Sequence, residues 1–497
     1  MRQPQANLQN LRRAALEIFH TALKELDAGA ALRSRVHLDG SRLTVFDAAY
    51  NLDRRATPVY AVAIGKAALS MAAALDEILG SRLGAGIVAA PSQVEAKMYA
   101  LLRQLVSVGQ VSEDEAGTEQ FRRVVRRAVE LCEEHDSQNP SPLSSRWKMF
   151  EAGHPLPNQG SIDAAREAVA LLQRADRERA LVVFLISGGG SAAFELPRDA
   201  RITLEDLREA NRVLVSCGAT IAEINSIRRA ISSVKGGRLS ALASNAQQIC
   251  LIVSDTNPGE ESTVASGLTF EPPEDAPEAL YVLSRYHLEK SLPASVFRAV
   301  NEATTKVGKI QSNADIRHHL LLDNQSAIEA ARRAAQAQGF LVELAPDIIE
   351  QPVDAGCREL LSRLYAGKTV DPDKVFCLIS GGEFACPVRG NGTGGRNAET
   401  ALRCVLDLDG QHQTDWSVKE SHIVILCAGT DGIDGNSPAA GAIADETTIE
   451  RARQFGLDAH ASLERSDAYT FFYTLGDAIV TGQTGTNVRD LRIMIAG

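Results

Sequence analysis

Four short segments of this chain combine apolar runs with glycine, charged or hydroxyl residues, and each suits the binding of an anion or a metal ion. They are Gly65-Lys66, the run SGGGS at 187–191, the run VSD that ends in Asp255, and the run GNGTGGRN at 390–397. In parallel α/β sheets, ligands bind beyond the carboxyl ends of strands, where loops present backbone N–H groups. A single glycine turn is ordinary. Four such segments in one chain predict a binding site for a polyanion.

Lys66 and the SGGGS loop carry the chemistry of an anion site. Lys66 begins a predicted helix, where the helix dipole disfavours a cation unless an anion lies nearby. Three consecutive glycines let successive N–H groups converge on one anion, and the flanking serines add hydroxyl donors. We therefore expect phosphate or carboxylate to bind at Ser187, Gly188, Gly189, Gly190 and Ser191. A strand-end aspartate such as Asp255 serves as a metal ligand, a base or a turn cap, and its residue type leaves these open.

The segment 390–397 has the spacing of a dinucleotide fingerprint, G-x-G-x-x-G, but lacks its context. Pro387 precedes it, and no strand-end acid follows at the required distance. Arg396 offers a planar, permanently charged fork for phosphate or carboxylate. No Walker A or protein-kinase signature occurs in the chain. His154 has no serine or cysteine partner in its segment, so it is either structural or in contact with substrate.

A doubly wound sheet is the element that would position these loops. Short β-branched runs alternate with helical stretches, which is typical of parallel α/β folds. The expected strands are 59–64, 86–90, 181–186, 248–254, 318–322, 374–379, 422–428 and 478–481. A chain of 497 residues exceeds one hydrophobic core. We expect domains at 1–300 and 301–497, with the polar stretch 93–148 as an insertion in the first.

Composition excludes several classes of protein. The net charge of −11 argues against nucleic acid as a partner, and no apolar run is long enough for a membrane span. The eight cysteines are scattered and contain no C-x-x-C pair, which is typical of buried thiols in a reducing compartment. We therefore expect a cytoplasmic protein.

Eight runs, in this order, resemble the glycerate 2-kinase family, whose C-terminal domain is known as MOFRL. They are AIGKAA (63–68), EAGHPLPN (151–158), SGGGSAAFELP (187–197), NSIRRAISSVKGGRL (225–239), VSDTNPGEESTVASG (253–267), GNGTGGRNAE (390–399), AGTDGIDGNSPAAGAI (428–443) and TGQTGTNVRDL (481–491). The resemblance extends from about residue 59 to the C-terminus, interrupted by 93–148.

The resemblance implies an α/β fold with a Rossmann-like N-terminal domain, a smaller C-terminal α/β domain and an active site in the cleft between them. It also implies transfer of the ATP γ-phosphoryl group to the 2-hydroxyl of D-glycerate, with Mg²⁺ as cofactor. The catalytic residues would be Lys66, Asp255 and Arg396, since phosphoryl transfer needs mainly positioning and neutralised charge. Further implied ligands of phosphate or nucleotide are Gly392, Gly394, Gly395 and Asn397, and the implied metal ligands are Asp255, Glu383 and Asp431.

The chain departs from the family pattern at several loop positions. Ala192, Phe384, Ala398 and Pro438 stand where the family usually has polar residues. Phe384 adds bulk beside Glu383, and we expect it either to narrow the ligand pocket or to form an apolar wall for a longer substrate. Two other readings stay open: an NAD(P)-dependent oxidoreductase of hydroxypyruvate or tartronate type, and a weakened paralogue that only binds a ligand. The sequence leaves the exact hydroxy acid undetermined and allows a homodimer.

Overall fold

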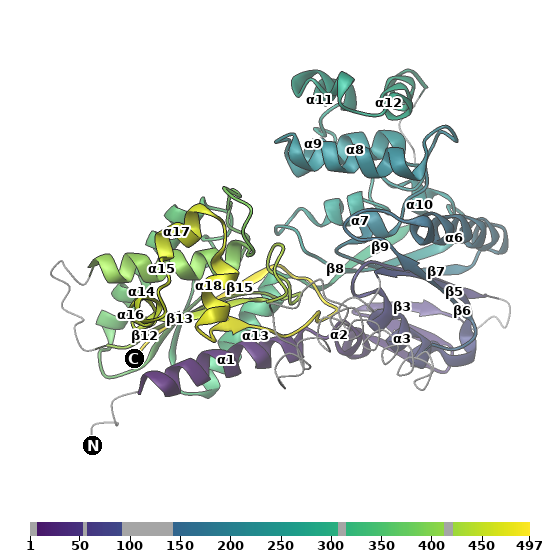
Figure 1. Cartoon of the computed structure of the whole chain (residues 1–497). Helices are drawn as coiled ribbons and strands as arrows, with labels where there is room; N and C mark the ends of the chain where they lie inside the picture. Colours follow the sequence, from purple (N-terminus) through teal and green to yellow (C-terminus); the bar gives the residue numbers. More distant parts are fainter. Residues whose placement is uncertain (1–6, 53–56, 92–142, 307–314, 412–420) are drawn as a thin grey trace, which may run out of the picture. The chain divides into compact units, whose positions relative to one another are not determined.

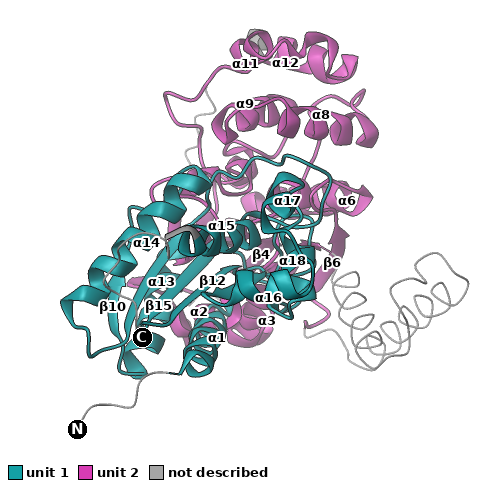
Figure 2. Cartoon of the chain, turned by 60° about the vertical axis from the view of Figure 1, so that its left-hand side comes forward, with its two compact units in different colours: residues 1–27, 93–138, 323–497 teal, residues 28–92, 139–322 magenta. Residues whose placement is uncertain are grey.

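The chain divides into two compact units (Figure 2). The computed structural model describes residues 7–52, 57–91, 143–306, 315–411 and 421–497. Within these ranges, unit 1 comprises 7–27, 323–411 and 421–497, and unit 2 comprises 28–52, 57–91, 143–306 and 315–322. Most of the stretch 93–148, predicted to be an insertion, lies outside the described residues. None of the described helices is both long and apolar enough to cross a membrane.

Unit 2 is built on a six-stranded sheet in which every strand pair is parallel. In spatial order the strands are β6 (Trp147–Ala152), β5 (Leu83–Pro91), β4 (Val59–Ile64), β7 (Leu181–Ser187), β8 (Gln247–Val253) and β9 (Ile316–Leu322). This is the 3-2-1-4-5-6 order of a Rossmann fold, so the predicted Rossmann-like architecture is confirmed. The order reverses between β4 and β7, and the loops after these two strands therefore lie at the switch point where such sheets bind ligands.

Helices hold this sheet in place through apolar contacts. α3 (Ala68–Leu79) and α6 (Gln159–Glu178) pack on it, and β4 and β7 are buried along their whole length. α6 begins where the Asn158 side chain accepts the N–H of Ser161, a reciprocal cap that fixes the helix start. A small antiparallel sheet of β1 (Val36–Asp39), β2 (Arg42–Val45) and β3 (Ala48–Asn51) follows α2 (Ala28–Arg35).

A separate helical layer completes unit 2 (Figure 1). Its members are α8 (Leu204–Ser216), α9 (Ile221–Ile231), α11 (Ala279–Arg285) and α12 (Ala294–Lys306). They share their own apolar core, which includes Leu207, Ile227 and Val296. Thr203 and Thr220 cap the first two helices in capping boxes with Asp206 and Glu223. The shared core and the two capping boxes therefore hold α8 and α9 together.

Unit 1 has a mixed six-stranded sheet. In spatial order its strands are β10 (Leu341–Leu344), β11 (Phe376–Gly382), β15 (Asp490–Ala496), β12 (Ile423–Gly429), β13 (Gly441–Asp445) and β14 (Ala478–Ile479). β10 and β11 are parallel, whereas β15 is antiparallel to both of its neighbours. α1 (Leu8–Glu25) and α13 (Asn324–Ala337) cover one face of the sheet. The opposite face carries α14 (Val353–Val370), α15 (Arg396–Gln411), α16 (Thr448–Gln454), α17 (Ala459–Glu464) and α18 (Ala468–Thr474).

The predicted strands all overlap observed strands, but the central strand of unit 1 was missed. β15 is entirely buried and yet contains Asp490 and Arg492, whose charges interrupt the apolar pattern that predicts a strand. Arg492 donates to the carbonyl oxygens of Gly381 and Gly382 at the end of β11.

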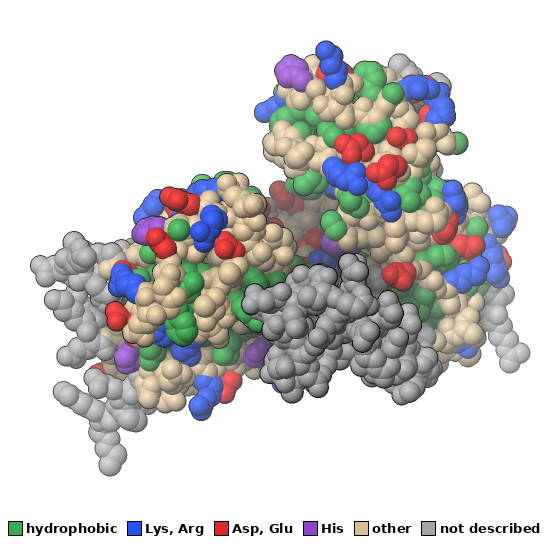
Figure 3. All heavy atoms as spheres, viewed as in Figure 1, with side chains coloured by type: hydrophobic (Ala, Val, Ile, Leu, Met, Phe, Trp, Pro, Cys, Tyr) green, Lys and Arg blue, Asp and Glu red, His purple; other side chains and the backbone are tan. Residues whose placement is uncertain are grey.

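Acidic and basic side chains are mixed over the face of the molecule that Figure 3 shows, and neither sign of charge dominates that face.

An ion-pair network fixes the N-terminal helix to the sheet of unit 1. The Arg12 guanidinium of α1 pairs with the carboxylates of Asp445 and Asp477, whose side chains are 2% and 5% exposed. Arg451 Nη2 lies 2.6 Å from the second oxygen of Asp477. Two buried carboxylates therefore depend on two arginines for their compensation.

Replacing Arg12 with alanine should lower the free energy of unfolding by about 2–3 kcal/mol, because Asp445 loses its closest cation while Arg451 still pairs with Asp477. Urea unfolding followed by circular dichroism measures this change. The matched control is Arg13→Ala, one position along the same helix and exposed, with an expected change within about 0.5 kcal/mol. Equal losses in both variants would contradict the network.

Candidate functional site

In unit 2, the loops that follow β4 and β7 are bonded to each other. The Lys66 N–H donates to the Gly188 carbonyl oxygen at 2.9 Å, and the Ala67 N–H donates to Ser187 Oγ at 3.0 Å. Ser187 Oγ in turn donates to the Ile64 carbonyl oxygen at 3.2 Å. Gly65 turns the chain with a φ of +105°, and a Cβ there would lie 2.5 Å from the Ser187 carbonyl oxygen. The turn that presents Lys66 is therefore compatible only with glycine.

The glycine loop also lies directly against Asp255 and Lys66. A Cβ at Gly188 would come well within 3.0 Å of Asp255 Oδ2. A Cβ at Gly189 would lie 3.3 Å from both Lys66 Cγ and His154 Nδ1. The structure thus gathers the predicted lysine, aspartate and glycine loop at the switch point of the sheet. The structure also places His154 beside this group of residues, and the sequence had left the role of His154 undecided.

The two serines of the SGGGS loop have different surroundings. Ser187 is buried and bonded to the β4 turn, so it supports the loop. Ser191 Oγ lies 2.8 Å from Ser266 Oγ, which donates to Asn225 Oδ1 at 2.9 Å. Sequence reasoning did not single out Asn225 or Ser266, although both fall in runs that carry the family resemblance.

In unit 1, Arg396 lies between two carboxylates. Arg396 Nε is 2.6 Å from Asp490 Oδ2, and Nη2 is 2.6 Å from Glu383 Oε1. Burial acts to lower the pKa of Arg396, but the charges of Asp490 and Glu383 outweigh it and raise that pKa above its usual range. The structure thus pairs the predicted catalytic arginine with a predicted metal ligand. Sequence reasoning did not single out Asp490, although it falls in the run 481–491 that carries the family resemblance.

The start of α15 is capped from within unit 1. The Asp434 carboxylate accepts the N–H groups of Asn397 and Ala398 at 2.9 and 2.8 Å. Asn397 Nδ2 donates to Asp490 Oδ1 at 2.9 Å. Asp434 therefore occupies the helix N-terminus, where the sequence placed a phosphate.

The glycines ahead of this helix are packed just as closely. The Gly394 N–H donates to Asn436 Oδ1 at 2.8 Å, and a Cβ at Gly395 would lie well within 3.0 Å of Asp434 Oδ1. A Cβ at Gly392 would lie 2.5 Å from Asp467 Cβ. Close packing accounts for each of these glycines, and phosphate binding by them stays a prediction.

Asp431, the third predicted metal ligand, lies after β12 beside the same group of charges. Its Oδ1 accepts the Ile433 N–H at 3.1 Å. A Cβ at Gly429 would lie 3.2 Å from Asp431 Oδ1 and 3.6 Å from Asp490 Oδ1. A cavity of about 310 Å³ borders the adjacent Thr430, but the hydroxyls of Thr430 and Thr484 in its wall donate to backbone carbonyls. These two hydroxyl protons are therefore already used within the protein.

Three of the departures from the family pattern have clear surroundings. Phe384 is 3% exposed, and its ring lies 3.5 Å from the guanidinium carbon of the buried Arg492. It contributes to the core of unit 1, so the expectation that it walls a pocket is wrong. Ala398 belongs to the same core, whereas Ala192 lines a cavity in unit 2. Ala192 is therefore the departure among these three that can contact a ligand.

Asp434 should make the stability of unit 1 depend on pH. Burial raises the pKa of Asp434 from 3.8 to about 7, although the N–H groups of Ala398 and Asn397 act to lower it. A carboxyl with a raised folded-state pKa contributes stability that is complete below pH 4 and is lost as the pH rises to 7.

The comparison that isolates this group is wild type against Asp434→Asn, which is uncharged at every pH. The free energy of unfolding of wild type relative to the variant should fall by a few kcal/mol between pH 4 and pH 7. Urea unfolding at pH values across this range measures the difference. A difference that does not change with pH would contradict the raised pKa.

Comparisons with known proteins identify the family of this chain. Residues 14–301 match the family described as "Domain of unknown function (DUF4147)", and residues 376–490 match the MOFRL family. The chain is 33% identical to the D-glycerate 2-kinase of Thermotoga maritima over 89% of this chain and 91% of that protein. It is 34% identical to a putative hydroxypyruvate reductase of Agrobacterium vitis over 71% and 89% of the two chains. The crystal structure of a glycerate kinase from Thermotoga maritima superposes with a TM-score of 0.72, at 28% identity, covering 98% of this chain and 100% of that one.

Proposed function

Because this chain belongs to the DUF4147–MOFRL family of glycerate kinases, we propose that it transfers the γ-phosphoryl group of ATP to the 2-hydroxyl group of D-glycerate. The products are 2-phosphoglycerate and ADP. The observation that carries the proposal is the contact of the glycine loop with both Lys66 and Asp255 at the sheet's switch point. Such a cluster supplies the positive charge and the carboxylate that phosphoryl transfer requires.

Each group of this cluster has a role in the proposed reaction. The 2-hydroxyl oxygen attacks the γ-phosphorus while the bond to the bridging oxygen of ADP breaks. Asp255 accepts the hydroxyl proton or holds the metal, and Lys66 stabilises the charge on the transferred group. The glycine loop lets the phosphates approach the backbone between them. Arg396, held by Asp490 and Glu383, is proposed as the second fixed positive charge.

We propose Mg²⁺ as the divalent cofactor, with Asp255 as its ligand. Among the described residues, no three His, Cys, Asp or Glu side chains gather as a metal cage. Mg²⁺ is usually bound by one or two carboxylates together with substrate phosphates, so Asp255 fits this requirement. The metal would neutralise phosphate charge. Glu383 is paired with Arg396, and its metal role therefore requires that this ion pair open.

An oxidoreductase is the second candidate, because one relative is a putative hydroxypyruvate reductase. A dinucleotide fingerprint opens directly from a strand into a helix. Here seven residues separate the end of β11 at Gly382 from the first fingerprint glycine at position 390. The N–H of Gly394 and the start of α15 are also bonded to Asn436 and Asp434. These contacts favour the kinase over the oxidoreductase.

The cytoplasmic location and the homodimer remain proposals from the sequence.

Lys66→Ala should lower kcat for D-glycerate by on the order of 100-fold or more, because a fixed positive charge is lost from the transition state. A coupled assay for ADP, with D-glycerate, ATP and Mg²⁺, measures this change. Lys148→Ala is the matched control, since Lys148 is an exposed lysine paired with Glu167 on the same unit. Oxidation of NAD(P)H with hydroxypyruvate by the unmodified protein, without phosphorylation of D-glycerate, would instead favour the reductase.

A further inference from the structure

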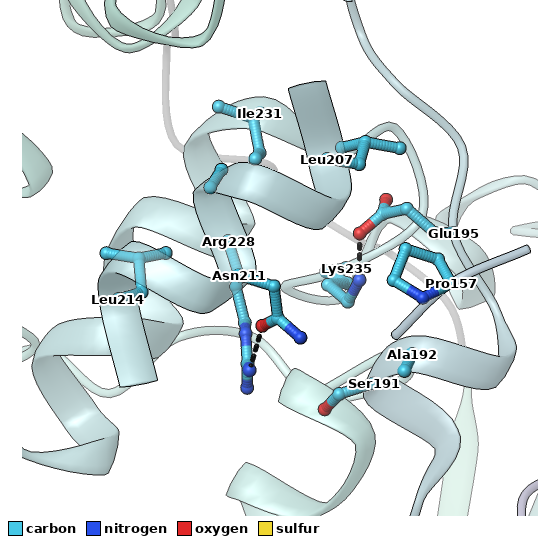
Figure 4. Close-up of a pocket in the computed structure, with 11 residues that line it drawn as sticks. Pro157, Ser191, Ala192, Glu195, Leu207, Asn211, Leu214, Arg228, Ile231 and Lys235 are labelled. Atoms are coloured by element: carbon cyan, nitrogen blue, oxygen red, sulfur yellow. Dashed lines mark hydrogen bonds and ion pairs between the residues drawn. The ribbon is translucent and has the colours of Figure 1, made fainter. Parts of the chain in front are cut away.

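A small cavity in unit 2 adjoins the glycine loop (Figure 4). It lies between α8, α9 and the start of α7 (Gly190–Ala193), and its polar wall includes Ser191, Asn211, Arg228 and Lys235. Its volume is about 30 Å³, which is room for about two water molecules. The cavity is therefore too small for a nucleotide, and it suits one small polar group such as a carboxylate.

The cavity carries one more positive than negative charge. Lys235 pairs with Glu195, and their side chains are 1% and 7% exposed. Arg228 Nη2 donates to Asn211 Oδ1 at 2.5 Å, so its hydrogen-bonded partner among the described residues is a neutral amide (Figure 4). Burial lowers the pKa of Arg228, and the charge of Glu195 offsets only part of this effect. A second, partly buried cation without its own carboxylate is costly unless a ligand supplies the anion.

Two loops connect this cavity to the Lys66–Asp255 cluster. Ser191 lines the cavity and is only two residues beyond Gly189 in the loop whose Gly188 and Gly189 contact Asp255 and Lys66. Pro157 also lines the cavity, and the loop that contains it includes His154, beside Gly189. α8 holds this loop, since Asn211 Nδ2 donates to the Pro155 carbonyl oxygen at 3.1 Å and Arg208 Nε donates to that of Pro157 at 2.9 Å.

We propose that this cavity binds the carboxylate of the 2-hydroxy acid substrate, with Arg228 as its ligand and Asn211 as the residue that positions Arg228. The inference rests on the proposed function, because the adjoining Lys66–Asp255 cluster then receives the 2-hydroxyl. The remaining wall is apolar, with Ala192, Leu207 and Ile231 among its residues. The cavity therefore has room for one carboxylate beside Arg228.

Arg228→Gln tests the assignment. Losing a charged hydrogen bond should raise KM for D-glycerate by about 10- to 100-fold and leave KM for ATP within twofold. Slow phosphorylation of glycerol, which lacks the carboxylate, should be unchanged, so the preference for D-glycerate over glycerol shrinks. Arg212→Gln on α8 is the control, because Arg212 is exposed and pairs with Glu205 and Glu209. It should leave all of these constants unchanged.

A second variant keeps the test valid if Arg228→Gln does not fold. Asn211→Asp preserves shape and places a carboxylate against Arg228, so it should weaken D-glycerate binding to a similar degree. Unchanged KM values for D-glycerate in both variants, with an active wild type, would overturn the subsite and leave the kinase standing.

Binding without turnover separates the two proposals. If wild type does not phosphorylate D-glycerate, the kinase proposal fails, and calorimetric titration of D-glycerate into wild type and both variants decides the subsite. Heat of binding that is lost in both variants would support the carboxylate site. No binding to wild type, or equal binding to all three proteins, would overturn it.

Discussion

The site in unit 2 depends on one steric constraint, which is the close approach of two backbone loops at a point where no side chain fits. Gly65 and Gly188 lie where a Cβ would collide with Ser187 and with Asp255. Since β4 and β7 are neighbours at the reversal of strand order, their loops leave the sheet side by side. The missing Cβ atoms let Lys66 bond to the glycine loop and let Asp255 lie against it. The backbone of these loops thus holds the positive charge of Lys66 and the carboxylate of Asp255 in place. Phosphoryl transfer uses this form of preorganisation.

Unit 1 differs from unit 2 because several of its charged side chains lie close together in a largely buried region. Arg396 compensates Asp490 and Glu383, while Asp434 is compensated by the N–H groups of α15. Each group is costly to bury alone and tolerable only in the presence of the others. The raised pKa of Asp434 shows that this compensation is incomplete.

The sequence predicted those features that depend on local pattern. The strands around Lys66, Ser187 and Asp255 are continuous apolar runs, so their ends and the loops after them could be placed. β15 could not be predicted, because Asp490 and Arg492 are buried only through partners far along the chain, in β11 and α15. The contact of α1 with the sheet of unit 1 was equally hidden, since an amphipathic helix does not specify which sheet it covers. Arg228 stood in a recognised run, but its cavity forms only when α8 and α9 pack together.

The most direct test of this account is the turnover of Gly188→Ala. Gly188 does not have a positive φ, and the three atoms nearest to an alanine Cβ there all belong to the Asp255 side chain. The account predicts that kcat for D-glycerate falls by on the order of 100-fold, since a displacement of about 1 Å at a reacting group has this effect. Circular dichroism should show an intact fold. A folded variant with kcat within twofold of wild type would contradict the claim that the contact between the glycine loop and Asp255 builds the site.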